Sequence, residues 1–157
     1  MRHLQRGVST VSPAVVAFTL ELPDTYSVTL RGQGPDNRLV RLSSEIGLGV
    51  AAWYRLVESP GERTWAARVV AHYYDLYDRD GHEIISYHWH PQARSHVTTP
   101  HLHLGGGVAA WRPDLTKAHL PTGYVTLEDV LMLAIGDLGV VPRRGDWRII
   151  LTSAEAP

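Results

Sequence analysis

Two β-prone segments joined by a short turn constrain the fold of this chain more than any other feature. Residues 64–77 alternate and are rich in valine, tyrosine and tryptophan, which is typical of a long strand. Asp78-Arg79-Asp80-Gly81 has the composition of a hairpin turn, and residues 82–90 are expected to return as the partner strand. If the hairpin turns at residues 78–81, Tyr77 lies opposite His82 and Tyr73 lies opposite Ser86.

This hairpin has two chemically different faces, because side chains alternate along a strand. One face is expected to carry His82, Ile84, Ser86, His88 and His90 beside Tyr73, Asp75 and Tyr77. The other face is expected to carry Ile85, Tyr87 and Trp89 beside His72, Tyr74 and Leu76. We therefore expect the second face to pack against a core and the first to be polar at its far end.

The rest of the chain indicates further strands and one clear helix. Strands are expected at residues 15–22, 26–31, 101–104 and 147–151, whereas residues 38–58 fit one or two strands or a short helix. Residues 127–138 carry a helical apolar stripe, with Thr126 as the N-cap and Asp129 as its capping-box partner. The prediction is a single α+β domain over residues 1–157, a mainly antiparallel β-sheet of hairpins with one helix from the C-terminal half packed on it.

Composition limits the classes of function. The chain has 157 residues, of which 44% are hydrophobic and 20% charged, as in a globular protein. A formal net charge of −1 provides no overall basic field, so a nucleic-acid partner would have to be held by a local patch. The absence of cysteine excludes disulfides, thiolate metal sites and cysteine nucleophiles. Because the first residues lack the apolar core of a signal peptide and no apolar run could span a bilayer, we expect a cytoplasmic protein without a membrane partner.

Histidines are concentrated in one part of the sequence. Seven of the nine lie between His82 and His119, and four of these form the pairs His88-Trp89-His90 and His101-Leu102-His103. Residues two apart on a strand point to the same side, so each pair presents two imidazoles to one surface. If residues 101–104 join the same sheet, the two pairs can meet, with Arg94 in the intervening loop above them.

Three interpretations of this cluster are open. In the first, His88 and His101 act as general acid and base without a cofactor, His90 and His103 orient or substitute for them, and Arg94 or Tyr73 stabilises a phosphate-like charge. A general acid, a general base and a group that stabilises negative charge are what cleavage of RNA through its 2′-hydroxyl requires.

In the second interpretation, the histidines of both pairs (His88, His90, His101 and His103) supply the ligands of one divalent ion, Zn²⁺, Fe²⁺ or Mn²⁺. A carboxylate such as Asp75 is available as a further ligand. Such a site would belong to a hydrolase or to a cupin-like domain, whose metal-binding strands the H-x-H pairs resemble. In the third, the histidines are structural and the sheet is a non-catalytic protein-interaction module.

The order of motifs resembles one known family. A Tyr87-His88 strand, then Pro100-His101-Leu102-His103, then a helix beginning Leu127-Glu128-Asp129-Val130-Leu131 is similar to the TumE-type toxins of bacterial toxin–antitoxin systems. The resemblance covers residues 73–136. It implies a toxin that acts on RNA or translation and is neutralised by an antitoxin protein.

The leading hypothesis is therefore a toxin-like small enzyme, a hydrolase of the ribonuclease or phosphodiesterase type, acting on RNA or nucleotides. Its expected partners are an antitoxin, an RNA or nucleotide substrate and a second copy of the chain in a homo-oligomer. The metal-binding domain and the interaction module are the alternatives.

Overall fold

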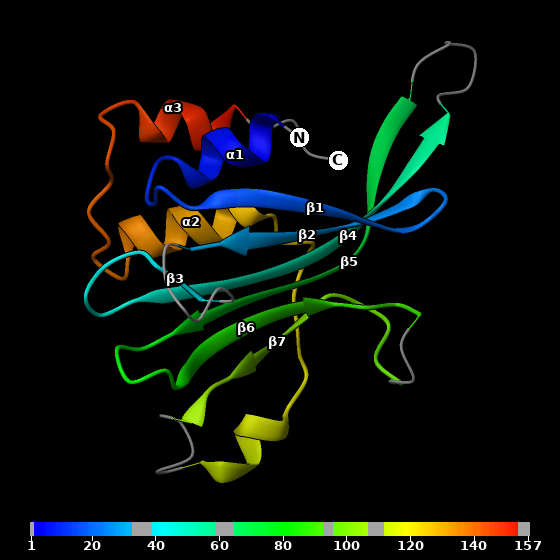
Figure 1. The fold of residues 1–157 in the computed structure, drawn as a ribbon. Coiled ribbons are helices and arrows are strands. Elements are labelled where there is room, and N and C mark those ends of the chain that lie inside the picture. Colours follow the sequence, from blue (N-terminus) through cyan, green and yellow to red (C-terminus); the bar gives the residue numbers. More distant parts are fainter. Residues whose placement is uncertain (1, 33–38, 59–64, 93–95, 107–111, 154–157) are drawn as a thin grey trace.

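The structure is a computed structural model that describes residues 2–32, 39–58, 65–92, 96–106 and 112–153. An antiparallel sheet runs through it in the order β1-β2-β4-β5-β6-β7-β8, with β3 also paired to β4 (Figure 1). The strands are β1 Val15–Leu22, β2 Thr25–Arg31, β3 Leu39–Arg41, β4 Gly47–Glu58, β5 Trp65–Tyr77, β6 Glu83–Trp89, β7 His101–Leu104 and β8 Leu120–Pro121. The expected α+β class with a mainly antiparallel sheet is confirmed.

The segment whose structure the sequence left open forms two strands. β2 and β3 occupy successive parts of the same edge of β4: Thr25 to Thr29 pair with one half and Leu39 to Arg41 with the other. A Cβ atom at Gly47 would lie 3.0 Å from the Leu39 side chain, so a larger residue there would require this side chain to shift.

Helical segments accompany the sheet. They are α1 Arg2–Val8, the 3-10 helix η2 Pro113–Lys117, α2 Leu127–Gly136 and α3 Trp147–Thr152. α2 has the expected capping box, in which the Asp129 amide donates to Thr126 Oγ1 and the Thr126 amide donates to Asp129 Oδ2. The helix ends two residues earlier than the apolar stripe predicts. Gly139 then adopts a φ of +72°, which glycine accommodates at a helix exit.

The expected strand at residues 147–151 is wrong, because this segment is helix α3. Its isoleucines and leucine favour a strand, but Ile150 and Leu151 are both buried, which adjacent residues of a one-sided strand cannot be. Trp147, Ile150 and Leu151 have the i, i+3, i+4 spacing of a helical face. α1 was not predicted at all, although Leu4 and Val8 have the same helical spacing and pack in or against the core.

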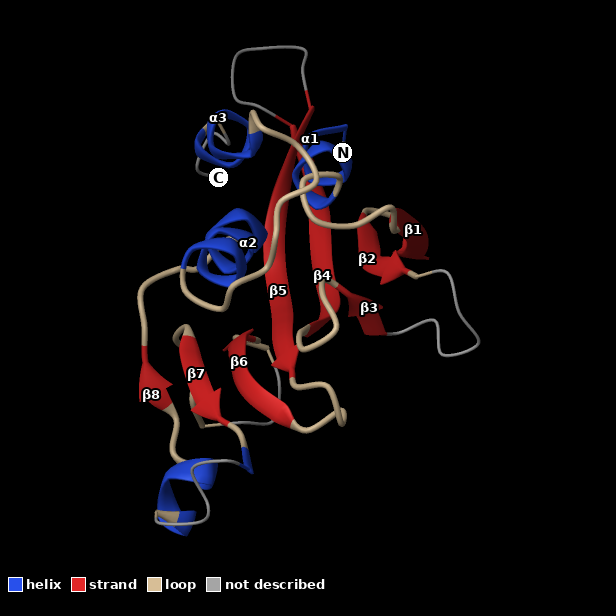
Figure 2. Cartoon of the chain, turned by 90° about the vertical axis from the view of Figure 1, so that its left-hand side faces the viewer, coloured by secondary structure: helices blue, strands red, loops and turns tan. Residues whose placement is uncertain are grey.

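The three α-helices lie on one side of the sheet (Figures 1 and 2). Leu127, Val130, Leu131 and Ala134 of α2 belong to the same buried cluster as Leu48, Val50, Tyr74 and Leu76 of the sheet. Leu48, Val50, Tyr74 and Leu76 therefore face the helices. Tyr73 and Asp75 face the opposite side, which we call the open face. Among the helices of the described ranges, none is long and apolar enough to cross a membrane.

The register of the β5–β6 hairpin differs from the expected one by two residues. Tyr73 pairs with His88 and Asp75 with Ser86, whereas Tyr73 was expected opposite Ser86. Asp78 Oδ1 accepts hydrogen bonds from the amides of Asp80 and His82, which makes the loop one residue longer than a turn at 78–81. An irregularity between Leu76 and Tyr77 adds the second residue. Because the shift is even, Tyr73, Asp75, Ser86 and His88 still share one face, as expected. Beyond the irregularity the expectation does not hold, because Tyr77 pairs with Glu83 and His82 lies in the turn.

Candidate functional site

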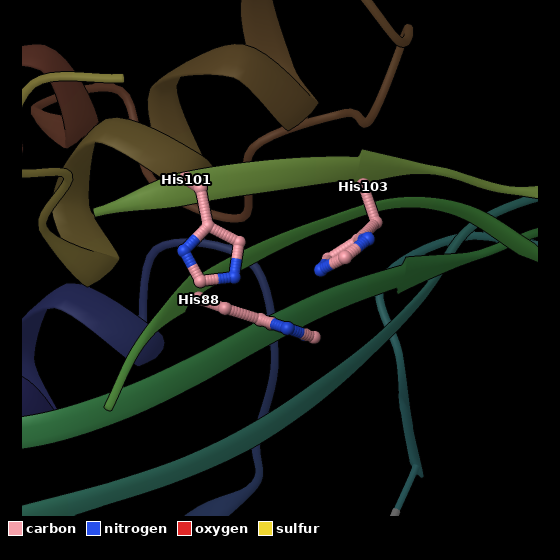
Figure 3. Close-up of side chains that lie close together, drawn as sticks. All are labelled: His88, His101 and His103. Atoms are coloured by element: carbon pink, nitrogen blue, oxygen red, sulfur yellow. The ribbon is translucent and has the colours of Figure 1, made fainter. Parts of the chain in front are cut away.

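The open face carries the two histidine pairs side by side at the β6–β7 ladder. His88 pairs directly with His101, and His103 pairs with Ser86 one step along the ladder. The three imidazoles project from neighbouring strands toward a common point (Figure 3). Their ring centroids are 4.9 Å apart for His88 and His103, 5.2 Å for His101 and His103, and 5.8 Å for His88 and His101. The expectation that residues 101–104 join the sheet beside His88 and His90 is confirmed.

These three rings are close enough to share one ion. One nitrogen from each of His88, His101 and His103 lies within 4.8 Å of the other two. Zinc–nitrogen bonds of about 2.0–2.1 Å in a tetrahedron require nitrogens roughly 3.4 Å apart. The imidazoles would therefore have to rotate to bring the three nitrogens to this separation around a single ion.

His101 is the most constrained of the three. Its side chain is 1% exposed, and Nδ1 lies 2.8 Å from the carbonyl oxygen of Thr99. A carbonyl oxygen only accepts, so Nδ1 carries the proton and donates it, and Nε2 of the neutral ring has the free lone pair. Nε2 is buried and finds no hydrogen-bond partner in the described part of the chain. A buried lone pair without a donor is costly unless something binds it.

His88 is held from its other side by a carboxylate. Its Nε2 lies 3.3 Å from Asp75 Oδ1, and both side chains are about one-fifth exposed, at 19% and 22%. Asp75 comes from β5, the next strand of the sheet. A carboxylate that accepts from one imidazole nitrogen orients the ring and makes the other nitrogen a better metal ligand.

His103 is kept neutral by its surroundings. Burial, followed by the nearby imidazoles of His88 and His119, lowers the pKa of His103 to about 4. Burial also lowers the pKa of His90 and, with neighbouring His101, that of His119. At neutral pH these rings are therefore uncharged, and each has one nitrogen lone pair available. This state suits a metal ligand better than a general acid.

Further side chains surround the three histidines. The His90 ring lies 5.3 Å from that of His101 and stacks on Tyr73 at 5.4 Å with an interplanar angle of 11°. Tyr73 in turn lies 4.7 Å from His88. Tyr73 and His90 were both expected in the site, and the structure brings them to it. Arg94 lies outside the described residues.

Two residues of the site were not predicted. The His119 ring lies 4.6 Å from His103 and 4.9 Å from His101, because β8 pairs with β7 directly after it. Ser86 is fully buried between Asp75 and His103, and its hydroxyl has no hydrogen-bond partner within the described ranges. The clustering of histidines pointed to His119, whereas β8 has only two residues and left no pattern to place it.

A second group of possible ligands has a structural explanation. Asp78, Asp80 and His82 lie close together at the β5–β6 turn. Asp78 uses its carboxylate to hold the amides of Asp80 and His82, and its Oδ2 lies 3.2 Å from His82 Nδ1. These contacts stabilise the hairpin turn, and this role explains why the three side chains lie close together.

The sequence and the structure were compared with protein-family models, curated proteins and solved structures. None of the three comparisons gave a significant match. The residues of this site are therefore the basis for inferring what the protein does.

Proposed function

We propose that His88, His101 and His103 bind one divalent transition-metal ion, and that this ion is the centre of the protein's activity. The observation that carries the proposal is the buried Nε2 of His101, whose lone pair faces two other imidazoles and has no hydrogen-bond donor among the described residues. A bound cation would satisfy this lone pair and those of its neighbours together.

The ligand set supports a catalytic ion rather than a purely structural one. Structural zinc sites usually have four protein ligands, whereas catalytic sites have three and keep a position for water or substrate. An ion held by His88, His101 and His103 would have only neutral ligands, and the chemistry that it would supply is activation of water for hydrolysis. The proposed activity is therefore metal-assisted hydrolysis.

The surrounding residues have roles that fit such a centre. Asp75 orients His88, and the Thr99 carbonyl orients His101, so two of the three ligands are held from the side away from the ion. The open face carries none of the described α-helices. Imidazole ligands suit Zn²⁺ and Fe²⁺. The chain has no cysteine, so it has no thiolate with which to bind softer metals such as Cu⁺.

Metal analysis of the purified protein tests the proposal. The protein is stripped with a chelator, reloaded separately with Zn²⁺, Mn²⁺ or Fe²⁺, desalted and analysed by mass spectrometry for bound metal. We expect one ion per chain for the preferred metal and its loss in His101→Ala. His82→Ala is the matched control, because His82 lies at the hairpin turn and is exposed. Equal loading of His101→Ala and the unmodified protein, or no stoichiometric metal in either, would contradict the proposal.

A second candidate function is supported by the His88–Asp75 pair. A carboxylate that orients an imidazole also prepares it for proton transfer, and His101 lies directly opposite. In this candidate the protein is a toxin-like enzyme that cleaves RNA or nucleotides without a metal and is neutralised by an antitoxin. The resemblance to TumE-type toxins supports this partner and substrate class.

RNA cleavage in the presence of a chelator separates the two candidates. The metal-free enzyme should cleave RNA in excess chelator and lose this activity in His88→Ala, and its expression should arrest bacterial growth unless an antitoxin is present. Activity that requires added metal would favour the first proposal. Growth arrest that survives both His88→Ala and His101→Ala would contradict a role of these histidines in toxicity.

A further inference from the structure

Two of the three proposed metal ligands are anchored, and among the described residues no hydrogen bond reaches the ring of the third, His103. His88 is oriented by Asp75 and His101 by the Thr99 carbonyl. The His103 ring instead contacts those of His88 and His101, with centroids 4.9 and 5.2 Å apart. A metal ligand usually donates its other ring N–H to an acceptor that fixes its orientation. A neighbouring acceptor would therefore complete the centre.

Ser86 lies beside His103 on the open face. It pairs directly with His103 across β6 and β7, and with Asp75 across β6 and β5. Residues directly opposite each other in antiparallel strands share a face of the sheet, with Cβ atoms about 4.5–5.5 Å apart. Asp75, Ser86 and His103 therefore form a row across three adjacent strands, in which the serine hydroxyl can turn toward either neighbour.

The hydroxyl of Ser86 is buried and unpaired in the described part of the chain. The side chain is fully buried, and its Oγ has no hydrogen-bond partner among the described residues. Burying a hydroxyl without a partner is costly, and an alanine would fill the same place without that cost. The hydroxyl can both donate and accept, so it is available to two polar neighbours at once.

His103 can supply the donor that this hydroxyl lacks. A neutral imidazole has one lone pair and one N–H, so a ring that gives its lone pair to an ion keeps a proton on the other nitrogen. The ring points toward His88 and His101 (Figure 3). An ion among the three rings would take Nε2, at the far end of the ring, and Nδ1–H would then lie close to the strand beside Ser86.

Asp75 can accept the proton of the same hydroxyl. Its Oδ1 lies 3.3 Å from His88 Nε2, whereas its Oδ2 lies 3.7 Å from where a Cβ atom of Gly49, on β4, would be. Oδ1 is therefore the oxygen on the β6 side, where Ser86 lies. A carboxylate oxygen has two lone pairs, so Oδ1 can accept from His88 and Ser86 together.

We propose that Ser86 is a positioning residue of the metal centre, which accepts a hydrogen bond from Nδ1–H of His103 and donates one to Oδ1 of Asp75. One carboxylate then orients two of the three ligands, His88 directly and His103 through the serine. This role rests on the proposed metal site, because the hydrogen bonds form when His103 binds the ion.

The affinity for Zn²⁺, measured by competition with a chromophoric chelator, tests this role. Ser86→Ala should weaken binding by about 10-fold, as is typical when the partner of a metal ligand is lost. Ser86→Thr retains the hydroxyl and should restore most of the affinity. Ser27→Ala is the matched control, because Ser27 lies on β2 and its Oγ donates to Glu21 instead. Equal affinity of Ser86→Ala and the unmodified protein would overturn the role and leave the metal site standing, whereas no binding by either would remove both.

The stability of the chelator-treated protein separates positioning from a structural role. Because the Ser86 hydroxyl is unpaired within the described ranges, its removal should leave the urea midpoint of the stripped protein unchanged or raise it. A serine that only supported the fold would show the opposite pattern, a lower midpoint with unchanged zinc affinity. A lower midpoint of stripped Ser86→Ala would therefore overturn the proposal.

A double-mutant cycle tests the hydrogen bond to Asp75. If Ser86 acts together with this carboxylate, Ser86→Ala should weaken zinc binding by only about 2-fold in an Asp75→Asn background, instead of about 10-fold in the unmodified protein. The same loss in both backgrounds would show that Ser86 acts independently of Asp75, and would contradict the proposed link between them.

Discussion

His88 and His101 lie directly opposite each other on adjacent strands, and their rings meet edge to face at 5.8 Å. Each ring has its own polar anchor, Asp75 for His88 and the Thr99 carbonyl for His101. The two anchors act from different elements, β5 and the segment before β7. The pair is therefore held in place before any ligand binds, which lowers the entropic cost of binding one.

The carboxylate of Asp75 should strengthen metal binding without contacting the ion. Asp75→Asn keeps the side-chain shape and removes the charge that orients His88, so we expect metal affinity to fall by about 10- to 100-fold. A competition titration against a chromophoric chelator measures this affinity. Asp80→Asn, at the exposed hairpin turn, should bind metal like the unmodified protein. Equal affinities in both variants would show that Asp75 has no positioning role.

Gly105 should be essential for the strand pairing that builds the site. A Cβ atom at this position would lie 1.6 Å from the carbonyl oxygen of Glu83, whereas one at Gly106 would have none of the described residues within 4 Å. Gly105→Ala must push β7 away from β6, and we expect it to lower the free energy of unfolding by about 3 kcal/mol. Gly106→Ala should change it by less than about 0.5 kcal/mol. Urea unfolding of the two neighbouring variants checks this, and similar values would contradict the close packing.

Buried His72 should make the protein less stable in acid. Burial, followed by the charge of His88, lowers the pKa of His72 to about 4, and its Nδ1 has no hydrogen-bond partner in the described part of the chain. As the pH falls below about 6.5, the unfolded chain binds a proton here while the folded chain does not. The free energy of unfolding therefore begins to fall below about pH 6.5. The decrease is complete near the pKa of the folded protein and reaches at most about 3 kcal/mol.

His72→Phe should remove this acid sensitivity. The free energy of unfolding of the unmodified protein should fall more between about pH 7 and pH 4.5 than that of the variant, by roughly 2 kcal/mol. The same comparison with His82→Asn, an exposed histidine, serves as the control. Parallel pH profiles for His72→Phe and the unmodified protein would mean that His72 is protonated in the folded state.

The capping box of α2 should contribute measurably to stability. Thr126 Oγ1 accepts from the Asp129 amide, and Thr126→Ala removes this acceptor, so we expect a loss of about 1 kcal/mol. Thr126→Ser retains the oxygen and should lose less than half of that. Thermal unfolding of both variants measures the difference, and equal losses would indicate that the methyl group, not the cap, stabilises the helix.

Local signals in the sequence accounted for much of the fold. Alternation assigned Asp75, His88 and Tyr73 to one face of the hairpin, and this assignment tolerated an error of two residues in register because the period of a strand is two. The capping box was likewise predicted, since Thr126 and Asp129 are only three residues apart in the sequence. Residues 147–151 were predicted wrongly, because strand propensity outweighed a helical spacing that only packing against α1 and α2 makes decisive.

The periods of strand and helix are local, so the order of residues already places His88 with His90, and His101 with His103, on one surface. Which surfaces meet depends on how the strands pair. The tertiary structure set β7 between β6 and β8, brought His119 to His103, and left Nε2 of His101 buried without a donor among the described residues. These relationships depend on long-range strand pairing and on the burial that follows from it, and neither is encoded in the spacing of neighbouring residues.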